Sequence, residues 1–339
     1  MAYTTIDDPS AFFQTFLYTG NQSGRQITLD GNSDLQPDLY WYKARNANHH
    51  YWVDSSRGTT KYIYSSLTSA EATVASAYVT SFNTNGFGVG GGDSGTNANG
   101  ISFGNWAWKC NGGTTASNTD GSLTSTVQAN TTAGFSIVTF TTDGATKTFG
   151  HGLGVKPDMV IVKSRSGAGA WIAMTDVIDG SVDYLILNAT NAAADLSYGA
   201  FTSSTFQYND NNAVTQVAYC FAEKQGYSKF GKYVGNGNAN GPFIYTGFKP
   251  AFVIMKNYSV GASWHMVDNK RLDYNPTTKV LYANLSNAEG TGDRVDLLSN
   301  GFKLKTTNTE VNGNGYNIIY MAFAENPFTT STGIPTTAR

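Results

Sequence analysis

The stretch that decides the fold is Gly247-Phe-Lys-Pro-Ala-Phe-Val-Ile-Met-Lys-Asn257. Its core is a proline, five mainly apolar residues and a lysine, and it occurs three times, at 37–43, 157–163 and 250–256. A sequence that repeats itself at a fixed distance builds one structural unit several times. The repeat therefore predicts three copies of one unit.

Further features recur around this core in the same order. An aromatic residue precedes the proline by 19, 17 and 17 positions, namely Tyr18, Phe140 and Tyr233. A tryptophan and an aspartate follow the lysine, with 11, 13 and 12 residues from lysine to aspartate, in the pairs Trp52/Asp54, Trp171/Asp176 and Trp264/Asp268. Each copy closes on an aromatic strand that ends at Trp108, Phe221 or Phe323.

The composition indicates an all-β protein. Charged residues make up 14% of the 339, aromatic residues 13%, and there are 37 glycines. Apolar and β-branched runs alternate with Asn-Gly and Asp-Gly turns, which favour tight hairpins. Only short windows, such as 68–77 and 188–195, have a sequence that could hold a helical turn. We predict three tandem antiparallel β-sandwich repeats, jelly-roll-like in topology. The predicted divisions are an N-terminal docking arm (1–15), repeat 1 (16–110), a linker or strand (111–134), repeat 2 (135–229), repeat 3 (230–328) and an extended tail (329–339).

The signature strand is apolar on both faces. In the third copy Phe252 and Ile254 share one face, and Val253 and Met255 share the other. A strand that is apolar on both sides is covered on both sides. One face is expected to cover the core of its own unit, and the other to meet a long loop, a neighbouring repeat or another subunit.

The ends and the cysteines give smaller predictions. Asp8-Pro9-Ser10 indicates a capped turn of helix, which serves either as a docking peptide or as a turn folded onto repeat 1. Cys110 and Cys220 are expected to be free thiols.

Charge and hydropathy argue against two classes of partner. The net charge of −2 gives no electrostatic reason to expect nucleic acid or an anionic membrane. No apolar run approaches the ~20 residues of a membrane span, and the N-terminus lacks the features of a secretory signal.

No catalytic constellation stands out. The histidines have no cysteine or carboxylate partners at zinc-ligand spacing, and His151 lies in a glycine-rich turn without the features of a phosphate loop. We expect Asp54, Asp176 and Asp268 to bond loop backbone or, in the first copy, to pair with Arg57. No catalytic residue, metal site or cofactor is predicted.

The candidate binding residues are aromatic and polar side chains in loops. Tyrosines flanked by asparagine and histidine suit sugar rings, which have an apolar face and hydroxyl edges. The alternative is that these tyrosines cover the second face of the signature strand. The candidates are His49, His50, Tyr51, Tyr258 and Tyr274.

Several motifs together resemble repeat-containing virion proteins of marine tailed bacteriophages, cyanophages among them. They are the opening Met1-Ala-Tyr-Thr-Thr-Ile-Asp-Asp-Pro-Ser10, then Tyr18-Thr-Gly-Asn21, Leu35-Gln-Pro-Asp38, Ala133-Gly-Phe-Ser-Ile-Val138, Gly150-His-Gly-Leu-Gly154 and the closing Phe323-Ala-Glu-Asn326. The resemblance implies a structural component of the virion, made in the host cytoplasm, and carries over no catalytic residue.

This resemblance leads to a functional expectation with two alternatives. We expect a non-enzymatic tail fibre or appendage component at the surface of the phage particle, which contacts the host surface. Its expected partners are other virion proteins, a homotrimer of itself and a host surface glycan. The alternatives are a head decoration or cement protein, and an enzyme that degrades envelope polysaccharide.

Overall fold

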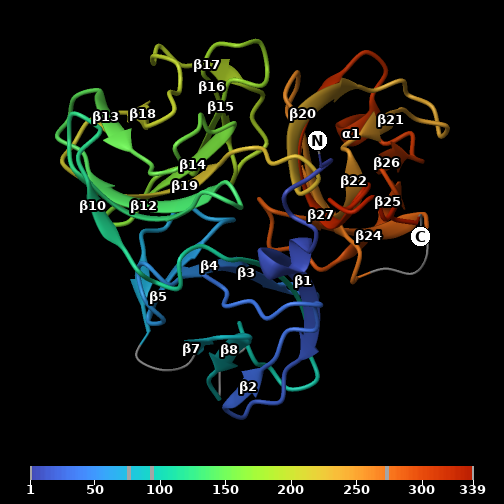
Figure 1. Cartoon of the computed structure of the whole chain (residues 1–339), viewed down its shortest axis with the longest axis horizontal. Helices are drawn as coiled ribbons and strands as arrows, with labels where there is room; N and C mark the ends of the chain where they lie inside the picture. The colour runs from blue at the N-terminus through green and yellow to red at the C-terminus, as the bar shows by residue number, and fades with distance from the viewer. Residues whose placement is uncertain (1, 75–77, 92–94, 272–274, 338–339) are drawn as a thin grey trace.

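The chain folds into three β-rich lobes that surround a common centre (Figure 1). The structure is a computed structural model, and it describes residues 2–74, 78–91, 95–271 and 275–337. We call the lobes lobe 1 (β1 to β9), lobe 2 (β10 to β19) and lobe 3 (β20 to β27). All hydrogen-bonded pairs of named strands are antiparallel. The predicted all-β class is therefore confirmed.

Lobe 1 has two sheets. The first has the order β1-β9-β3-β4-β5-β6 and the second β2-β8-β7. The elements are η1 (Pro9–Ala11), β1 (Phe13–Thr19), β2 (Arg25–Ile27), β3 (Leu39–Ala44), β4 (His50–Asp54), β5 (Lys61–Tyr64), β6 (Ala72–Thr73), β7 (Val79–Asn83), β8 (Gly86–Val89) and β9 (Ser102–Trp108).

Lobe 2 has an eight-stranded sheet with the order β10-β11-β12-β19-β14-β15-β16-β17 and a small sheet of β13 and β18. Its strands are β10 (Ala116–Asn118), β11 (Ser125–Asn130), β12 (Phe135–Thr141), β13 (Lys147–Gly150), β14 (Met159–Ser164), β15 (Ile172–Thr175), β16 (Asp183–Ile186), β17 (Ala194–Asp195), β18 (Thr205–Tyr208) and β19 (Thr215–Phe221).

Lobe 3 has one curled sheet with the order β20-β27-β22-β23-β24-β25-β26-β21. Its elements are β20 (Ser228–Val234), β21 (Phe243–Tyr245), β22 (Phe248–Asn257), β23 (Trp264–Asp268), β24 (Thr277–Tyr282), β25 (Gly290–Leu298), β26 (Gly301–Leu304), α1 (Thr309–Asn312) and β27 (Asn317–Pro327). No helix in the described part of the chain is long and apolar enough to cross a membrane.

The signature strands β3, β14 and β22 lie in the middle of their sheets, and all of their residues are buried. In β22, Val253 and Met255 pack into the core of lobe 3. Phe252 and Ile254 point the other way, into a second cluster to which all three lobes contribute. We call this cluster the central core. The second face of the signature strand was expected to meet a long loop, a neighbouring repeat or another subunit. In the structure it meets the neighbouring lobes.

The central core is rich in aromatic rings. All six tryptophans belong to it and each is at most 3% exposed. Phe252 of lobe 3 lies 5.5 Å from the ring of Trp106 and 6.0 Å from that of Phe13, both in lobe 1. Trp52 of lobe 1 lies 4.7 Å from Tyr219 of lobe 2. Large rigid rings bury much apolar area each, so this core joins the lobes into one body.

The lobes also make equivalent main-chain contacts in a closed cycle. The loop after each signature strand donates to a loop of the preceding lobe, the one that follows the second strand after that lobe's own signature strand (β5, β16 or β24), and lobe 1 donates to lobe 3. The three bonds are each 2.8 Å long: Gly169 N to Thr68 O, Ala262 N to Thr190 O, and Asn48 N to Ser286 O. The ring therefore closes although no peptide link joins lobe 3 to lobe 1.

The N-terminal segment strengthens this unlinked contact. Asp8 caps η1 by accepting from Ser10 N at 3.0 Å, as predicted. Thr4 donates to Gln225 O at 2.7 Å, and Tyr3 donates to Gly247 O at 2.7 Å. The segment before lobe 1 is thus folded onto lobe 3, and not only onto the first unit.

Other local predictions had mixed outcomes. The segment predicted as a linker or strand (111–134) contains the strand β11, which pairs with β12. The predicted helical windows are wrong within the described residues, because 72–73 and 194–195 are the short strands β6 and β17. The short helix α1 was not predicted; Asn308 caps it by accepting from Glu310 N at 2.9 Å.

The register corrects the alignment of the tryptophans. The strand residue opposite the signature lysine is His50 in lobe 1 and Trp264 in lobe 3. Trp171 holds the same place beside β14, next to Ile172, which faces Val162. Trp52 is thus not their counterpart, because the loop after Lys43 is one residue shorter and the spacing alone matched the wrong side chain.

Candidate functional site

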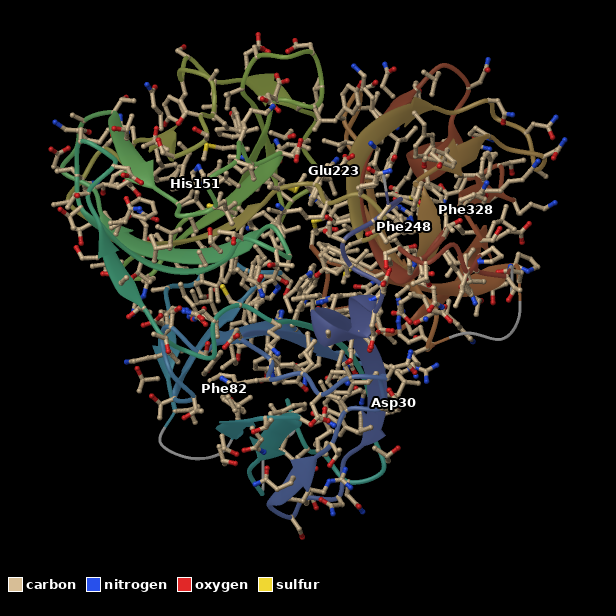
Figure 2. All side chains as sticks on the ribbon, in the orientation of Figure 1. Asp30, Phe82, His151, Glu223, Phe248 and Phe328 are labelled. Atoms are coloured by element: carbon tan, nitrogen blue, oxygen red, sulfur yellow. The ribbon has the colours of Figure 1, made fainter. Side chains whose placement is uncertain are left out.

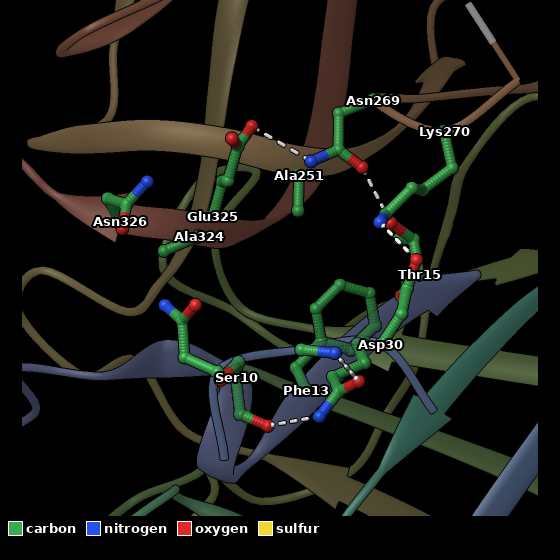
Figure 3. Close-up of a pocket in the computed structure, with 13 residues that line it drawn as sticks. Ser10, Phe13, Thr15, Asp30, Ala251, Asn269, Lys270, Ala324, Glu325 and Asn326 are labelled. Carbon is green, nitrogen blue, oxygen red and sulfur yellow. Dashed lines mark hydrogen bonds and ion pairs between the residues drawn. The ribbon is translucent and has the colours of Figure 1, made fainter. Parts of the chain in front are cut away.

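A pocket of about 260 Å³ lies where lobe 1 meets lobe 3 (Figure 3). One wall comes from η1, β1 and the turn at 30–32, and the other comes from β22, the two residues after β23 (269–270) and β27. We call it the seam pocket. Its apolar floor includes Phe13 and Ala251, which are 2% and 4% exposed.

Asn269 fixes the lobe 3 wall. Its main-chain nitrogen donates to Ala251 O at 2.8 Å, and its Nδ2 donates to Glu325 Oε2 at 2.8 Å. Its Oδ1 accepts from Thr15 Oγ1 of lobe 1 at 2.6 Å. Lys249 also pairs with Glu325, at 3.2 Å. The amide is therefore held at both ends, and its bond to Thr15 crosses the seam.

The opposite wall belongs to lobe 1, and Asp30 and Gln14 hold it in place. Lys270 of lobe 3 pairs with Asp30 of lobe 1 at 2.8 Å, and both are partly exposed. Gln14 donates to Ser10 O at 2.9 Å and accepts from Gly31 N at 2.9 Å, which fixes the turn that carries Asp30. The pocket thus presents carboxylates, amides and an ammonium group on rigid supports.

This arrangement suits a small polar ligand. Planar amides and carboxylates offer donors and acceptors in fixed directions, and Phe13, Ala251 and Ala324 give an apolar floor. A sugar ring has both kinds of surface. The pocket residues come from five separate segments, and of them Ala251, Ala324 and Glu325 stand in motifs that recur in the sequence.

The predicted binding residues do not form a site. His50 is fully buried and accepts from Trp41 Nε1 at 2.9 Å, and burial holds its pKa well below the usual value. Tyr51 is 4% exposed and stacks on Tyr42 with ring centroids 4.9 Å apart. Neither side chain is exposed as a binding residue needs to be, and Tyr51 packs into the core of lobe 1. It therefore does not cover the second face of the signature strand, as the alternative proposed.

The other three candidates are separated. His49 is half-buried, and its Nδ1 lies 3.0 Å from Ser66 Oγ. Tyr258 is partly buried against the central core where lobe 3 meets lobe 2. Tyr274 lies outside the described residues. None of the described candidates lines the seam pocket.

The recurring aspartates have the predicted folding role in two lobes. Asp54 accepts from Arg57 N at 2.9 Å and pairs with its Nε at 2.5 Å. Asp268 makes the same two contacts with Arg271, at 2.9 and 2.6 Å. Asp176 instead pairs with Lys156 at 2.5 Å.

Buried charges extend these pairs across two of the three seams. Glu71 of lobe 1 pairs with Arg57 at 3.0 Å and with Arg165 of lobe 2 at 2.9 Å. Glu289 of lobe 3 pairs with Arg271 at 3.2 Å and with Arg45 of lobe 1 at 2.6 Å. Each buried carboxylate has two cationic partners, so these networks hold lobes together.

The three signature lysines have main-chain carbonyls as partners. Lys256 donates to Ala262 O at 2.8 Å, to Asn257 O at 2.9 Å and to Thr190 O of lobe 2 at 3.0 Å. Lys163 donates likewise to Thr68 O of lobe 1 at 3.2 Å. Burial lowers the pKa of Lys43, Lys163 and Lys256 to about 8.

The remaining reactive side chains are buried. Cys110 and Cys220 are free, as predicted, and burial raises the pKa of Cys220 to about 12. His151 lies inside lobe 2 (Figure 2), where its Nδ1 accepts from Leu153 N at 3.2 Å. These groups support the fold and do not face the seam pocket.

The comparisons with known proteins give one positive result. No curated protein and no solved structure matches the chain. A family model described as a domain of unknown function (DUF7483) matches residues 8–327, which run from the cap of η1 to the end of β27. The three lobes thus fall within one family domain, and the chain belongs to the DUF7483 family.

Proposed function

We propose that this protein is a non-enzymatic structural component of a phage virion, placed in a tail fibre or similar appendage, where it contacts the host surface. The proposal begins from the resemblance of the sequence motifs to phage virion proteins. The observation that carries it is the use of the buried charges. Glu71 of lobe 1 pairs with Arg165 of lobe 2, and Glu289 of lobe 3 pairs with Arg45 of lobe 1, which joins lobes as a rigid assembly unit requires.

We further propose that the three lobes are copies of one sandwich unit. Support comes from the shared order of strands around β3, β14 and β22, each of which lies between a closing strand and the next strand of the chain. The cycle of equivalent main-chain bonds supports the same idea. The jelly-roll-like topology stays a prediction.

The contact with the host is assigned to the seam pocket. Its polar walls and apolar floor fit one ring of a surface glycan, and its position between two lobes keeps both walls rigid. Lys270 and Asp30 are exposed enough to exchange their mutual ion pair for bonds to sugar hydroxyls. A saccharide is therefore the proposed ligand class.

Lobe 3 also offers a surface for other virion proteins or for a homotrimer. Strand β21 is the last strand of its sheet, and its Phe243 and Tyr245 are 46% and 53% exposed. Exposed aromatic side chains on an edge strand favour pairing with another chain.

One observation favours the enzyme alternative. Two carboxylates, Asp30 and Glu325, line the same pocket, and paired carboxylates are the usual machinery for cleaving glycosidic bonds. Each is ion-paired with a lysine, Lys270 or Lys249, so we retain binding as the primary proposal. Incubation with host polysaccharide distinguishes the two, because only an enzyme releases new reducing ends.

The decisive experiment is labelling of intact virions with antibodies against the purified protein, viewed by electron microscopy. Label on the tail appendages is expected. Label on the head would favour the decoration alternative, and particles that lack the protein altogether would overturn the virion proposal.

Glycan binding is tested separately on purified protein. Binding to oligosaccharides from the host envelope should weaken at least tenfold in Lys270→Ala, whose ammonium lies at the pocket. Lys147→Ala is the matched control, because Lys147 forms a similarly exposed ion pair in lobe 2, with Asp143 at 3.3 Å. Equal binding by both variants would exclude the seam pocket.

A further inference from the structure

Three carboxylates meet in lobe 2 at Asp179, Asp183 and Asp195. One oxygen from each lies within 4.8 Å of the other two. Asp183 begins β16 and is paired directly with Asp195 on β17, while Asp179 belongs to the loop before β16. Like charges placed opposite each other across two strands destabilise a sheet, so the cluster needs an explanation.

Asp183 is the distinctive member. It is 3% exposed, and its Oδ2 has no hydrogen-bond partner among the described residues. Burial and a hydrogen bond shared with Asp195 raise the pKa of Asp183 to about 6. Above that pH both carboxyls are ionised, and an ionised carboxylate accepts hydrogen bonds but cannot donate them, so Asp195 then cannot satisfy Asp183. A buried acceptor without a partner is costly, and an oxygen of the same carboxyl lies within 4.8 Å of oxygens of Asp179 and Asp195.

The same places in lobe 1 have the opposite charge. Strand β5 begins with Lys61, which pairs with Thr73 of β6 and donates to its hydroxyl at 2.5 Å. Strand β16 begins with Asp183, paired with Asp195. The loops correspond too, since Gly58 N bonds to Asp54 O and Gly180 N bonds to Asp176 O, both at 3.0 Å.

The residue before the loop glycine completes the comparison. It is Arg57 in lobe 1 and Asp179 in lobe 2. The glycines have positive φ angles of 89° and 101°, so the two loops turn in the same way. Two cations and a threonine in lobe 1 are therefore replaced by three carboxylates in lobe 2 on a matching backbone.

Within the described residues, the cation that acts on this cluster is Lys232, and its charge acts on Asp179 rather than on the buried Asp183. The hydrogen bonds from Ser181 lower the pKa of Asp179, and the charge of Lys232 lowers it further by a smaller amount. Lys232 itself donates to Ile178 O. Asp179 accepts from Ser181 N at 2.9 Å and from Ser181 Oγ at 2.7 Å. In the described structure Asp183 has no ion pair.

We propose that Asp179, Asp183 and Asp195 form a divalent-cation site that takes calcium. Ca²⁺ prefers oxygen ligands at about 2.3–2.6 Å, so oxygens around one ion lie at most roughly 5 Å apart. The three carboxylate oxygens, all within 4.8 Å of one another, meet this limit. Ca²⁺ accepts six to eight oxygens, and water can fill the exposed positions beside Asp179 and Asp195. Zinc fits less well, because the cluster has no histidine or cysteine.

The site would also strengthen one seam. Ala193 N, two residues before Asp195, donates to Tyr258 O of lobe 3 at 3.0 Å. This is the seam where the described residues lack the arginine–glutamate networks found at the other two. An ion bound by β16 and β17 would fix the segment that contacts lobe 3.

Calorimetric titration of the full chain, first treated with a chelator and then dialysed, tests the site with CaCl₂ as the probe. We expect one ion per chain and a higher Tm with calcium than without. Asp183→Asn and Asp195→Asn should each weaken binding at least tenfold. Asp195 is exposed, so its variant tests the site even if a change at the buried position affects folding.

Asp34→Asn is the matched control, because Asp34 is an exposed aspartate of lobe 1 away from the cluster. It should bind calcium as the native chain does. Absence of binding up to 10 mM CaCl₂, which is about ten times the weakest calcium sites of extracellular modules, would overturn the proposal. Binding that persists unchanged in both cluster variants would overturn it too.

Discussion

Replacement of Phe252 by alanine tests whether the three lobes are energetically one body. Phe252 lies on the signature strand of lobe 3, is fully buried and projects into the central core. Its ring lies within 6.4 Å of the rings of Phe13, Trp41, Trp106 and Trp108, all of lobe 1. The substitution therefore removes a contact between lobes without touching the core of lobe 3.

The expected loss is about 3–5 kcal/mol of unfolding free energy, the usual cost of Phe→Ala in a packed core. The upper part of this range applies here because the surrounding rings are large and rigid and cannot collapse into the space. Phe302→Ala is the matched control. Phe302 is also fully buried, but it packs within lobe 3, 5.3 Å from Tyr320.

Urea unfolding followed by two signals separates the possibilities. Tryptophan fluorescence reports on the central core, which contains all six tryptophans, and far-ultraviolet circular dichroism reports on all sheets. If the lobes unfold together, the two curves coincide and Phe252→Ala shifts both. The reasoning is refuted if the variant loses less than about 1 kcal/mol, or if circular dichroism shows a separate transition that Phe252→Ala leaves unchanged.

Three further predictions concern buried polar groups. Glu71→Gln should lower the free energy of unfolding in urea by about 3 kcal/mol, because it leaves Arg57 buried without one of its two anionic partners. The exposed control Lys147→Ala should lower it by under about 0.5 kcal/mol. Equal losses in the two variants would contradict the role assigned to Glu71. The pKa of Lys256 in the folded protein is about 8, against an ordinary value of 10.5. Between pH 8 and pH 10.5 the unfolded chain therefore binds more protons at this lysine than the folded protein does. The free energy of unfolding that depends on this group accordingly rises with pH. The difference in unfolding free energy between native protein and Lys256→Met should therefore change in favour of the native protein from pH 8 to pH 9.5, and a constant difference would show that the amine titrates normally. Cys110 and Cys220 should react with a thiol reagent only after unfolding, because both are buried and burial raises the pKa of each; rapid reaction of the native protein would contradict this burial.

The sequence predicted the features that depend on neighbouring residues. The alternation of Phe252 and Ile254 with Val253 and Met255 was sufficient to indicate a strand covered on both faces. The Asp8 cap follows from local hydrogen bonding. The pairing of β11 with β12 was predictable because only a short turn separates them.

The features that sequence could not supply depend on distant segments. The seam pocket brings together residues as far apart as Thr15 and Asn269. The aromatic candidates at His50 and Tyr51 were misassigned because an aromatic strand and an aromatic binding surface have the same composition, and only burial distinguishes them. Spacing also misplaced Trp52, because one deleted loop residue changes which strand position a side chain occupies.

The two ends of the folded body lie together on lobe 3. Ser331 N donates to Asp7 Oδ1 at 2.6 Å, and Phe328 N donates to Gly247 O at 3.3 Å. A short connector between these ends, with a new cut in the loop between lobes 2 and 3, would yield a circular permutant in which every strand keeps its neighbours. The fold therefore does not depend on which lobe comes first in the polypeptide. A second protein could be fused either at the present ends or at the new ends between lobes 2 and 3.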